Sequence, residues 1–120
     1  MKSKQEIFTA SYTRMLAQGE PSTDGKSCIY RKPNGHGCAI GVLISDELAA
    51  LYDSGDNDTI FRCVDLYIEK TPSWIKDNVN FLSDIQCCHD NYYHLPTAEW
   101  LVKFKIGMAE VARQYGLHIA

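Results

Sequence analysis

Apolar residues recur at helical spacing in several stretches of this chain, and capping residues stand at their ends. The first stretch begins at the capping box Ser3–Glu6 and ends at Gly19, which predicts a helix near the N-terminus. A second helix is expected after Ser45, which is a suitable N-cap. A third is expected from Ser73 to about Asn91, and a fourth from Thr97 to a left-handed cap at Gly116.

The two C-terminal stretches each predict one buried face. The stripe of the third helix consists of Ile75, Val79, Leu82, Gln86 and His89. The stripe of the fourth consists of Leu101, Phe104, Met108, Val111 and Tyr115. Because Gln86 and His89 stand in an otherwise apolar stripe, the sequence predicts polar groups on the inward face of the third helix.

The segment between the first two helices has a different pattern. Ser27–Lys32 is typical of a short strand, and Pro33–Gly35 of a hairpin turn. Cys38–Ile44 fits either a buried strand or the first turns of a helix, and Ile60–Ile68 fits a strand or a short helix. The pattern therefore predicts an α+β fold: a single domain over residues 1–120, with three to four helices packed around a short β-hairpin.

Composition narrows the class of protein. The 120 residues are 45% hydrophobic and 22% charged, as in an ordinary globular domain. A net charge of −3 argues against broad phosphate-driven binding of nucleic acid. The polar start predicts no secretory signal, and no apolar run is long enough to span a membrane. The odd number of five cysteines fits free thiols in a reducing cytoplasm.

The segment Cys28–Ile44 holds most of the candidate chemistry. Cys38 follows two glycines and would open a helix, where the helix dipole stabilises a thiolate. A cysteine-dependent hydrolase or transferase would then use Cys38 as nucleophile, His89 as base and Asp90 to orient the histidine. The alternative is that Cys38 is a small buried residue and that His89 is a hydrogen-bonded core side chain.

Zinc is a second alternative for the same residues. The candidate ligands are Cys28, Cys38, Cys88 and His89, which have the right donor atoms. The chain lacks the closely spaced cysteine or histidine pairs of known structural zinc sites. The preferred expectation is therefore that no cofactor is bound, with zinc as the alternative. Unrelated core thiols are the plainer interpretation of the four residues.

The candidate binding residues surround the same turn. They are Tyr30, Arg31, Lys32, Asn34, His36 and Trp74. The cationic groups would hold a phosphate, and Tyr30 or Trp74 would stack on a nucleotide base. The structural alternative for Arg31 is an internal ion pair, with Asp46, Asp84 or Asp90 as its partner.

Five blocks of the sequence, taken in their order, carry a resemblance. They are Cys28-x-Tyr-Arg31, Gly37-Cys-Ala-Ile-Gly41, Leu43-Ile-Ser-Asp-Glu47, Phe81-Leu-x-Asp-Ile-Gln-x-x-His-Asp90 and Ala112-Arg-x-Tyr-Gly-Leu117. In this order the blocks resemble a family of small phage and prophage proteins that has no assigned activity. The resemblance implies a viral or prophage source and a host cytoplasm, but no reaction.

Three functions follow in order of preference. The first is a phage accessory protein, more a binder than an enzyme, that inhibits or redirects a host protein such as a defence component. The second is a small-ligand or nucleotide-binding protein that uses the Cys28–Cys38 hairpin. The third is the cysteine-dependent enzyme. No membrane partner is expected, and a homodimer is left open.

Overall fold

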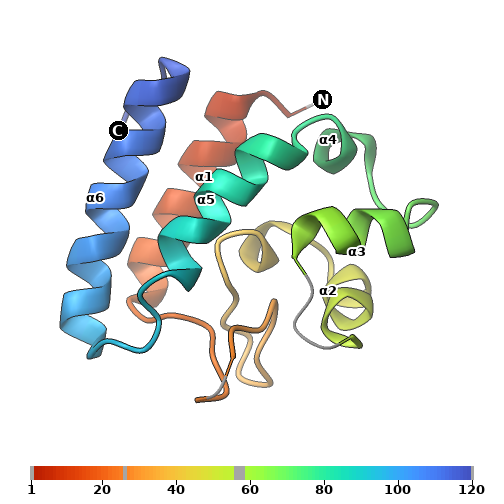
Figure 1. Ribbon diagram of the computed structural model, residues 1–120, viewed down its shortest axis with the longest axis horizontal. Helices are drawn as coiled ribbons and strands as arrows, with labels where there is room; N and C mark the ends of the chain where they lie inside the picture. The colour runs from red at the N-terminus through yellow and green to blue at the C-terminus, as the bar shows by residue number, and fades with distance from the viewer. Residues whose placement is uncertain (1, 26, 56–58, 120) are drawn as a thin grey trace.

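The computed structural model describes residues 2–25, 27–55 and 59–119, and helices dominate its architecture (Figure 1). The six α-helices and one 3-10 helix of these residues are α1 (Lys4–Gln18), η1 (Gly41–Leu43), α2 (Asp46–Asp53), α3 (Ile60–Leu66), α4 (Ser73–Lys76), α5 (Val79–Asp90) and α6 (Thr97–Tyr115). None of the helices in these ranges combines the length and apolar composition that crossing a membrane requires.

Helix α5 is the centre of the fold. It contacts α6, α3 and α4, while α1 contacts α6 and η1. Figure 1 shows α6 beside α1 and α5, with α2 and α3 at the other side of the molecule and the loop after α1 passing beneath them. The core fills the space between these groups and includes the fully buried Trp100, Tyr52, Phe8 and Phe81.

Several helix ends lie where the sequence predicts them. The Ser3 hydroxyl accepts the Glu6 N–H, and the Glu6 carboxylate accepts the Ser3 N–H in return. Ser45 caps α2, and Gly116 ends α6 in the left-handed conformation with φ 67°. These caps satisfy backbone groups that a helix terminus leaves without partners, so local sequence alone was sufficient to place them.

The predicted α+β fold is wrong, because the segment between α1 and α2 forms no hairpin. Among the described residues the only β-type pairings are two isolated bridges, Thr23 with Cys28 and Arg31 with Gly37. The Pro33–Gly35 turn does form: the Gly35 N–H donates to the Lys32 carbonyl at 2.9 Å, and Gly35 has φ 90°. The turn is present, but the strands on either side of it are not.

Side chains from the helices take the place of a partner strand along this segment. The Asp53 carboxylate of α2 accepts the N–H groups of Tyr30 and Arg31 at 2.7 and 3.0 Å. The Gln18 amide of α1 both donates to the Gly37 carbonyl and accepts the Gly37 N–H, each at 2.9 Å. Because buried backbone groups need partners, these bonds allow the segment to lie against helices without a sheet.

The third predicted helix is interrupted, and this is a second correction. Residues 73–91 form α4 and α5, with a break at Asp77 and Asn78, where the Asn78 side chain donates to the Trp74 carbonyl at 2.7 Å. The Asn side chain competes with the backbone for that carbonyl, as it often does at helix ends. The two ambiguous segments resolve into η1 and α3, neither of which is a strand.

Candidate functional site

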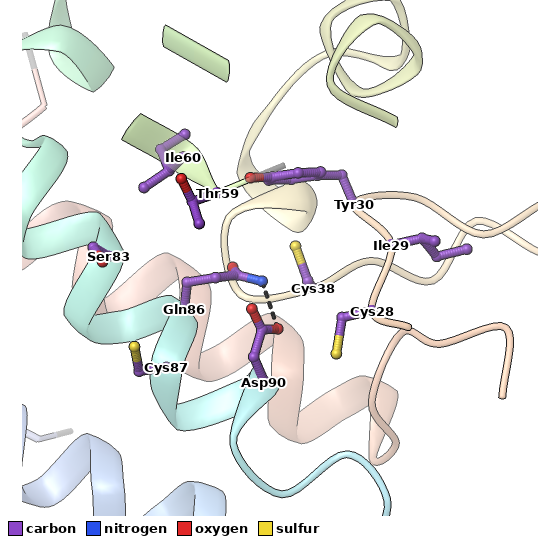
Figure 2. Close-up of a pocket in the computed structure, with 10 residues that line it drawn as sticks. All are labelled: Cys28, Ile29, Tyr30, Cys38, Thr59, Ile60, Ser83, Gln86, Cys87 and Asp90. Carbon is purple, nitrogen blue, oxygen red and sulfur yellow. Dashed lines mark hydrogen bonds between the residues drawn. The ribbon is translucent and has the colours of Figure 1, made fainter. Parts of the chain in front are cut away.

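A small pocket lies where the loop after α1 meets α3 and α5 (Figure 2). Its volume is about 90 Å³, room for a few water molecules or a small functional group. The loop contributes Cys28, Ile29, Tyr30 and Cys38, the start of α3 contributes Thr59 and Ile60, and α5 contributes Ser83, Gln86, Cys87 and Asp90. Three cysteines and a carboxylate from distant parts of the sequence thus meet in one place.

Asp90 is the acidic group of this pocket, and its position is fixed. Its Oδ1 accepts hydrogen bonds from Gln86 Nε2 at 2.9 Å and from His89 Nδ1 at 2.7 Å. The Gln86 amide is itself held by the Ile40 N–H, which donates to Gln86 Oε1 at 3.1 Å. The side chain of Asp90 remains 40% exposed. A carboxylate fixed in this way is available to a donor that enters the pocket.

His89 is fully buried behind Asp90, and both of its ring nitrogens are occupied. The Ser22 N–H donates to His89 Nε2 at 2.8 Å, while His89 Nδ1 meets Asp90. A backbone N–H can only donate, so Nε2 must be the acceptor and Nδ1 must carry the proton. The indole Nε1 of Trp100 donates to the His89 carbonyl at 3.0 Å and ties this residue to α6.

The thiol beside this pair is Cys28, whereas the sequence hypothesis named Cys38. Atoms of Cys28, His89 and Asp90 lie within 4.8 Å of one another. Burial, and then the negative charge of Asp90, raises the pKa of the Cys28 thiol well above its usual range. Burial also raises the pKa of Cys38, which is 1% exposed, to about 12. Both thiols are held in the protonated form, which is a poor nucleophile.

The same cluster offers the donor types of a zinc site, but its geometry argues against one. Cys88, one of the four predicted ligands, faces α6: a Cβ placed on Gly107 would lie 2.9 Å from its Sγ. Cys28 and His89 do come close together. Since Ser22 makes Nε2 an acceptor, the Nδ1 that faces Asp90 carries a proton and has no lone pair for a metal.

The predicted phosphate-binding cations are engaged with acidic groups of the fold. Arg31 pairs with Asp46, one of its three predicted partners, and donates to the carbonyls of Gly41 at 2.8 Å and Ile44 at 2.7 Å. Lys32 Nζ and His36 Nδ1 both lie near the Glu20 carboxylate, at 3.9 and 2.6 Å. A phosphate would have to displace these carboxylates.

The other predicted binding residues do not form one surface. Tyr30 is buried, with its hydroxyl 3.7 Å from the Cys63 sulfur. The Asn34 side chain accepts the His36 N–H at 2.9 Å and thereby stabilises the turn. Trp74 belongs to α4, at the opposite end of the molecule from the loop after α1, and the Lys2 ammonium lies 4.6 Å from its ring centre (Figure 1). Tyr30 and Trp74 therefore cannot stack on the same base.

Three residues that the sequence pattern did not single out organise this region. Ser22 fixes the tautomer of His89, while Asp53 and Gln18 hold the loop against α2 and α1. Their partners on α5, by contrast, gave a signal in advance, because Gln86 and His89 are polar residues in an apolar stripe. The chain was compared with protein-family models, with curated proteins and with solved structures, and none of them matches it.

Proposed function

We propose that this chain is a phage or prophage accessory protein that binds a host protein and blocks or redirects it, without catalysing a reaction. The observation that carries the proposal is the exposed surface of α3 and the turn after it. Phe61, Leu66 and Ile68 are 46%, 51% and 46% exposed there. Exposed apolar surface marks candidate interaction sites, and Phe is among the residue types enriched at protein interfaces.

The polar neighbours of these side chains also fit an interface. On α3, the exposed Arg62 and Asp65 lie between Phe61 and Leu66 around the helix. A protein surface that pairs apolar contacts with charged ones selects its partner by both shape and charge. The resemblance to small phage proteins makes a host protein the natural partner.

The chemistry of the pocket supports binding over catalysis. The thiols of Cys28 and Cys38 have raised pKa values, and the ring of His89 is occupied at both nitrogens. A cysteine enzyme needs the opposite arrangement, in which a free imidazole nitrogen takes the thiol proton. We therefore place the cysteine-dependent enzyme last among the three functions.

Affinity capture from a bacterial lysate with matched variants tests the proposal. We expect Phe61→Glu and Leu66→Glu to lose a host protein that the wild-type chain retains at moderate salt. Ile119→Glu is the matched control, because Ile119 is as exposed as Phe61 but lies beyond α6. Retention of the host protein by both α3 variants, or capture of no host protein at all, would overturn the proposal.

A small ligand in the pocket is a second candidate, supported by the half-exposed Asp90. The carboxylate, together with the acceptor oxygens of Gln86, Thr59 and Ser83, suits a small cationic donor better than a phosphate. This differs from a nucleotide site, because the cations of the loop are already paired with Asp46 and Glu20.

Thermal unfolding in the presence of methylamine, acetamidine and ADP separates these ligand classes. A ligand that binds only the folded chain raises its melting temperature, by an amount that grows with the logarithm of the ligand concentration above its dissociation constant. We expect stabilisation by the amine or amidine, loss of the effect in Asp90→Asn, and no effect of ADP. Stabilisation by ADP alone would contradict this assignment, as would no response to any of the three.

A further inference from the structure

We infer that the outward face of α6 is the interface of a weak, antiparallel homodimer. The inference is independent of the proposed function, because α6 and α3 lie on opposite sides of the molecule (Figure 1). The charges on this face of α6 are complementary to those of a second copy of the chain. Four observations support the inference.

The first observation is an apolar stripe that faces away from the core. The buried side of α6 carries Trp100, Phe104 and Met108. At 3.6 residues per turn, Val102 and Ile106 lie about half a turn from them, on the far side of the helix. Val102 is 56% exposed and Ile106 is 61% exposed, the largest fraction among the exposed large hydrophobic residues described.

The second observation is the symmetry of charge along this stripe. Glu99 stands seven positions before Ile106, and Arg113 stands seven positions after it. Both are exposed on the same side of the helix as Ile106. If a two-fold axis passes beside Ile106 and runs perpendicular to the helix, Glu99 of each copy lies opposite Arg113 of the other. Such an interface is self-complementary, as a two-fold dimer requires.

The flanks of the stripe add a second pair of opposite charges. Lys103 and Glu110 are exposed along one edge, three positions before and four positions after Ile106. The same axis brings Lys103 of one copy close to Glu110 of the other, and the reverse pair forms by symmetry. In a parallel pair, Glu99 would face Glu99 and Arg113 would face Arg113. Electrostatics therefore select the antiparallel arrangement.

The third observation is that forming these contacts costs little within the monomer. Arg113 pairs with Glu110 of its own helix, but both side chains are more than half exposed. An exposed ion pair of this kind contributes little to stability, so Arg113 is free to bridge to a second copy. The Lys103 ammonium lies 5.9 Å from the ring centre of Tyr92, an exposed cation–π contact at the outer limit of the usual range, which also costs little to give up.

The fourth observation is the size of α6, which sets the strength of the dimer. Its 19 residues give a helix of about 28 Å. A contact of one helix with its copy buries less than the about 800 Å² per partner of a standard interface. The dimer is accordingly weak, and its population depends on protein concentration.

Sedimentation equilibrium from about 10 μM to about 1 mM protein tests this inference. We expect the wild-type chain to pass from monomer to dimer over this range, and Ile106→Glu to weaken the dimer by at least tenfold. The circular dichroism of Ile106→Glu should match the wild type, because the side chain is exposed. Leu66→Glu, on α3, is the control that should leave the dimer unchanged even if it removes a host partner.

Charge-swap variants test the orientation of the two helices. Glu99→Arg alone places a second guanidinium opposite Arg113 and should weaken the dimer several-fold. The double variant Glu99→Arg/Arg113→Glu should restore it to within about threefold of the wild type. A mixture of Glu99→Arg and Arg113→Glu chains should form heterodimers in preference to either homodimer. A wild-type monomer at every concentration, or a dimer unchanged by Ile106→Glu, would overturn the inference.

Discussion

The N–H of Ser22 donates to Nε2 of His89 at 2.8 Å, in the interior of the protein. This single bond determines what the ring can do. With Nε2 occupied as an acceptor, the ring donates its Nδ1 proton to Asp90 and is neither a free base nor a metal ligand. His89 and Asp90, which resemble a catalytic pair in the sequence, thus have a structural role. The His89 ring joins Ser22 of the loop to Asp90 at the end of α5.

Metal content is the most direct test of this tautomer. We expect protein purified without chelator to carry well below one zinc ion per chain, measured by inductively coupled plasma mass spectrometry. The reason is that zinc at Cys28, His89 and Asp90 would need the Nδ1 lone pair that the Ser22 bond excludes. Stoichiometric zinc that disappears in Cys28→Ser would contradict the hydrogen-bond assignment.

Replacing Gly41 tests how tightly the loop is packed. A Cβ at this position would lie 1.7 Å from the Tyr30 carbonyl oxygen, which is rigid backbone. We expect Gly41→Ala to lower the free energy of unfolding in urea by about 3 kcal/mol or more, because the loop must move to make room. The chain should lose cooperative unfolding if the loop cannot adjust.

Gly35→Ala is the matched control for this experiment. Gly35 lies in the same loop, and a methyl group added there would meet nothing within 4 Å, but its φ of 90° is unfavourable for alanine. That strain is expected to cost about 1–2 kcal/mol. Equal destabilisation by the two variants would show that the approach of Gly41 to Tyr30 is looser than the structure gives.

The helix ends were predictable from sequence because their causes are local. Ser3, Ser45 and Gly116 each act within one helical turn, so a short window of sequence contains the whole interaction. The inward direction of Gln86 and His89 was predictable for the same reason, since both follow the apolar period of α5. What remained hidden was which distant groups these side chains would bind.

The predicted hairpin is wrong because the group that binds the backbone of this segment lies elsewhere in the chain. A strand over Ser27–Lys32 needs a partner for its backbone, and that role belongs to Asp53, which no local pattern links to Tyr30. The candidate nucleophile failed in a similar way. Nothing in the sequence decides whether Cys28 or Cys38 lies next to His89 in the folded chain. Only the packing of the loop on α5 places Cys28 beside it.

Thiol labelling gives a test of the pocket at each cysteine. We expect iodoacetamide at neutral pH to modify Cys87 first, because it is the exposed thiol, and to leave Cys38 and Cys88 unmodified in the folded chain. Burial raises the pKa of both protected thiols to about 12, so neither is available as thiolate. Peptide mapping by mass spectrometry reads out each site.

The Asp90→Asn variant extends this test to Cys28. The Asp90 charge contributes to the raised pKa of the Cys28 thiol, after burial. An asparagine removes that charge, while its side-chain oxygen can still accept from His89 and Gln86. We expect Cys28 to be labelled several-fold faster in the variant at pH 8.5, with Cys87 as the internal standard. Rapid labelling of Cys38 in the wild type would instead revive the nucleophile hypothesis.

The buried thiols also predict how stability changes with pH. The pKa of Cys38 is about 12 in the folded chain and close to its ordinary value of 9.0 in the unfolded chain. Below pH 8 both states keep the proton, so Cys38 adds no pH dependence. Between about pH 9 and 12 only the unfolded state releases it, so the free energy of unfolding falls as pH rises, by up to about 1.4 kcal/mol per pH unit.

Urea unfolding at pH 8 and pH 10 measures this loss. The wild-type chain should lose more stability over the interval than Cys38→Ala does, by an amount on the order of 1–2 kcal/mol. The comparison uses the change with pH within each variant, so the cavity left by the missing sulfur cancels. Cys87→Ala serves as the control, because Cys87 is exposed and should reduce the loss less. The same pH dependence in wild type and Cys38→Ala would mean that the Cys38 thiol ionises in the folded chain as readily as in the unfolded one.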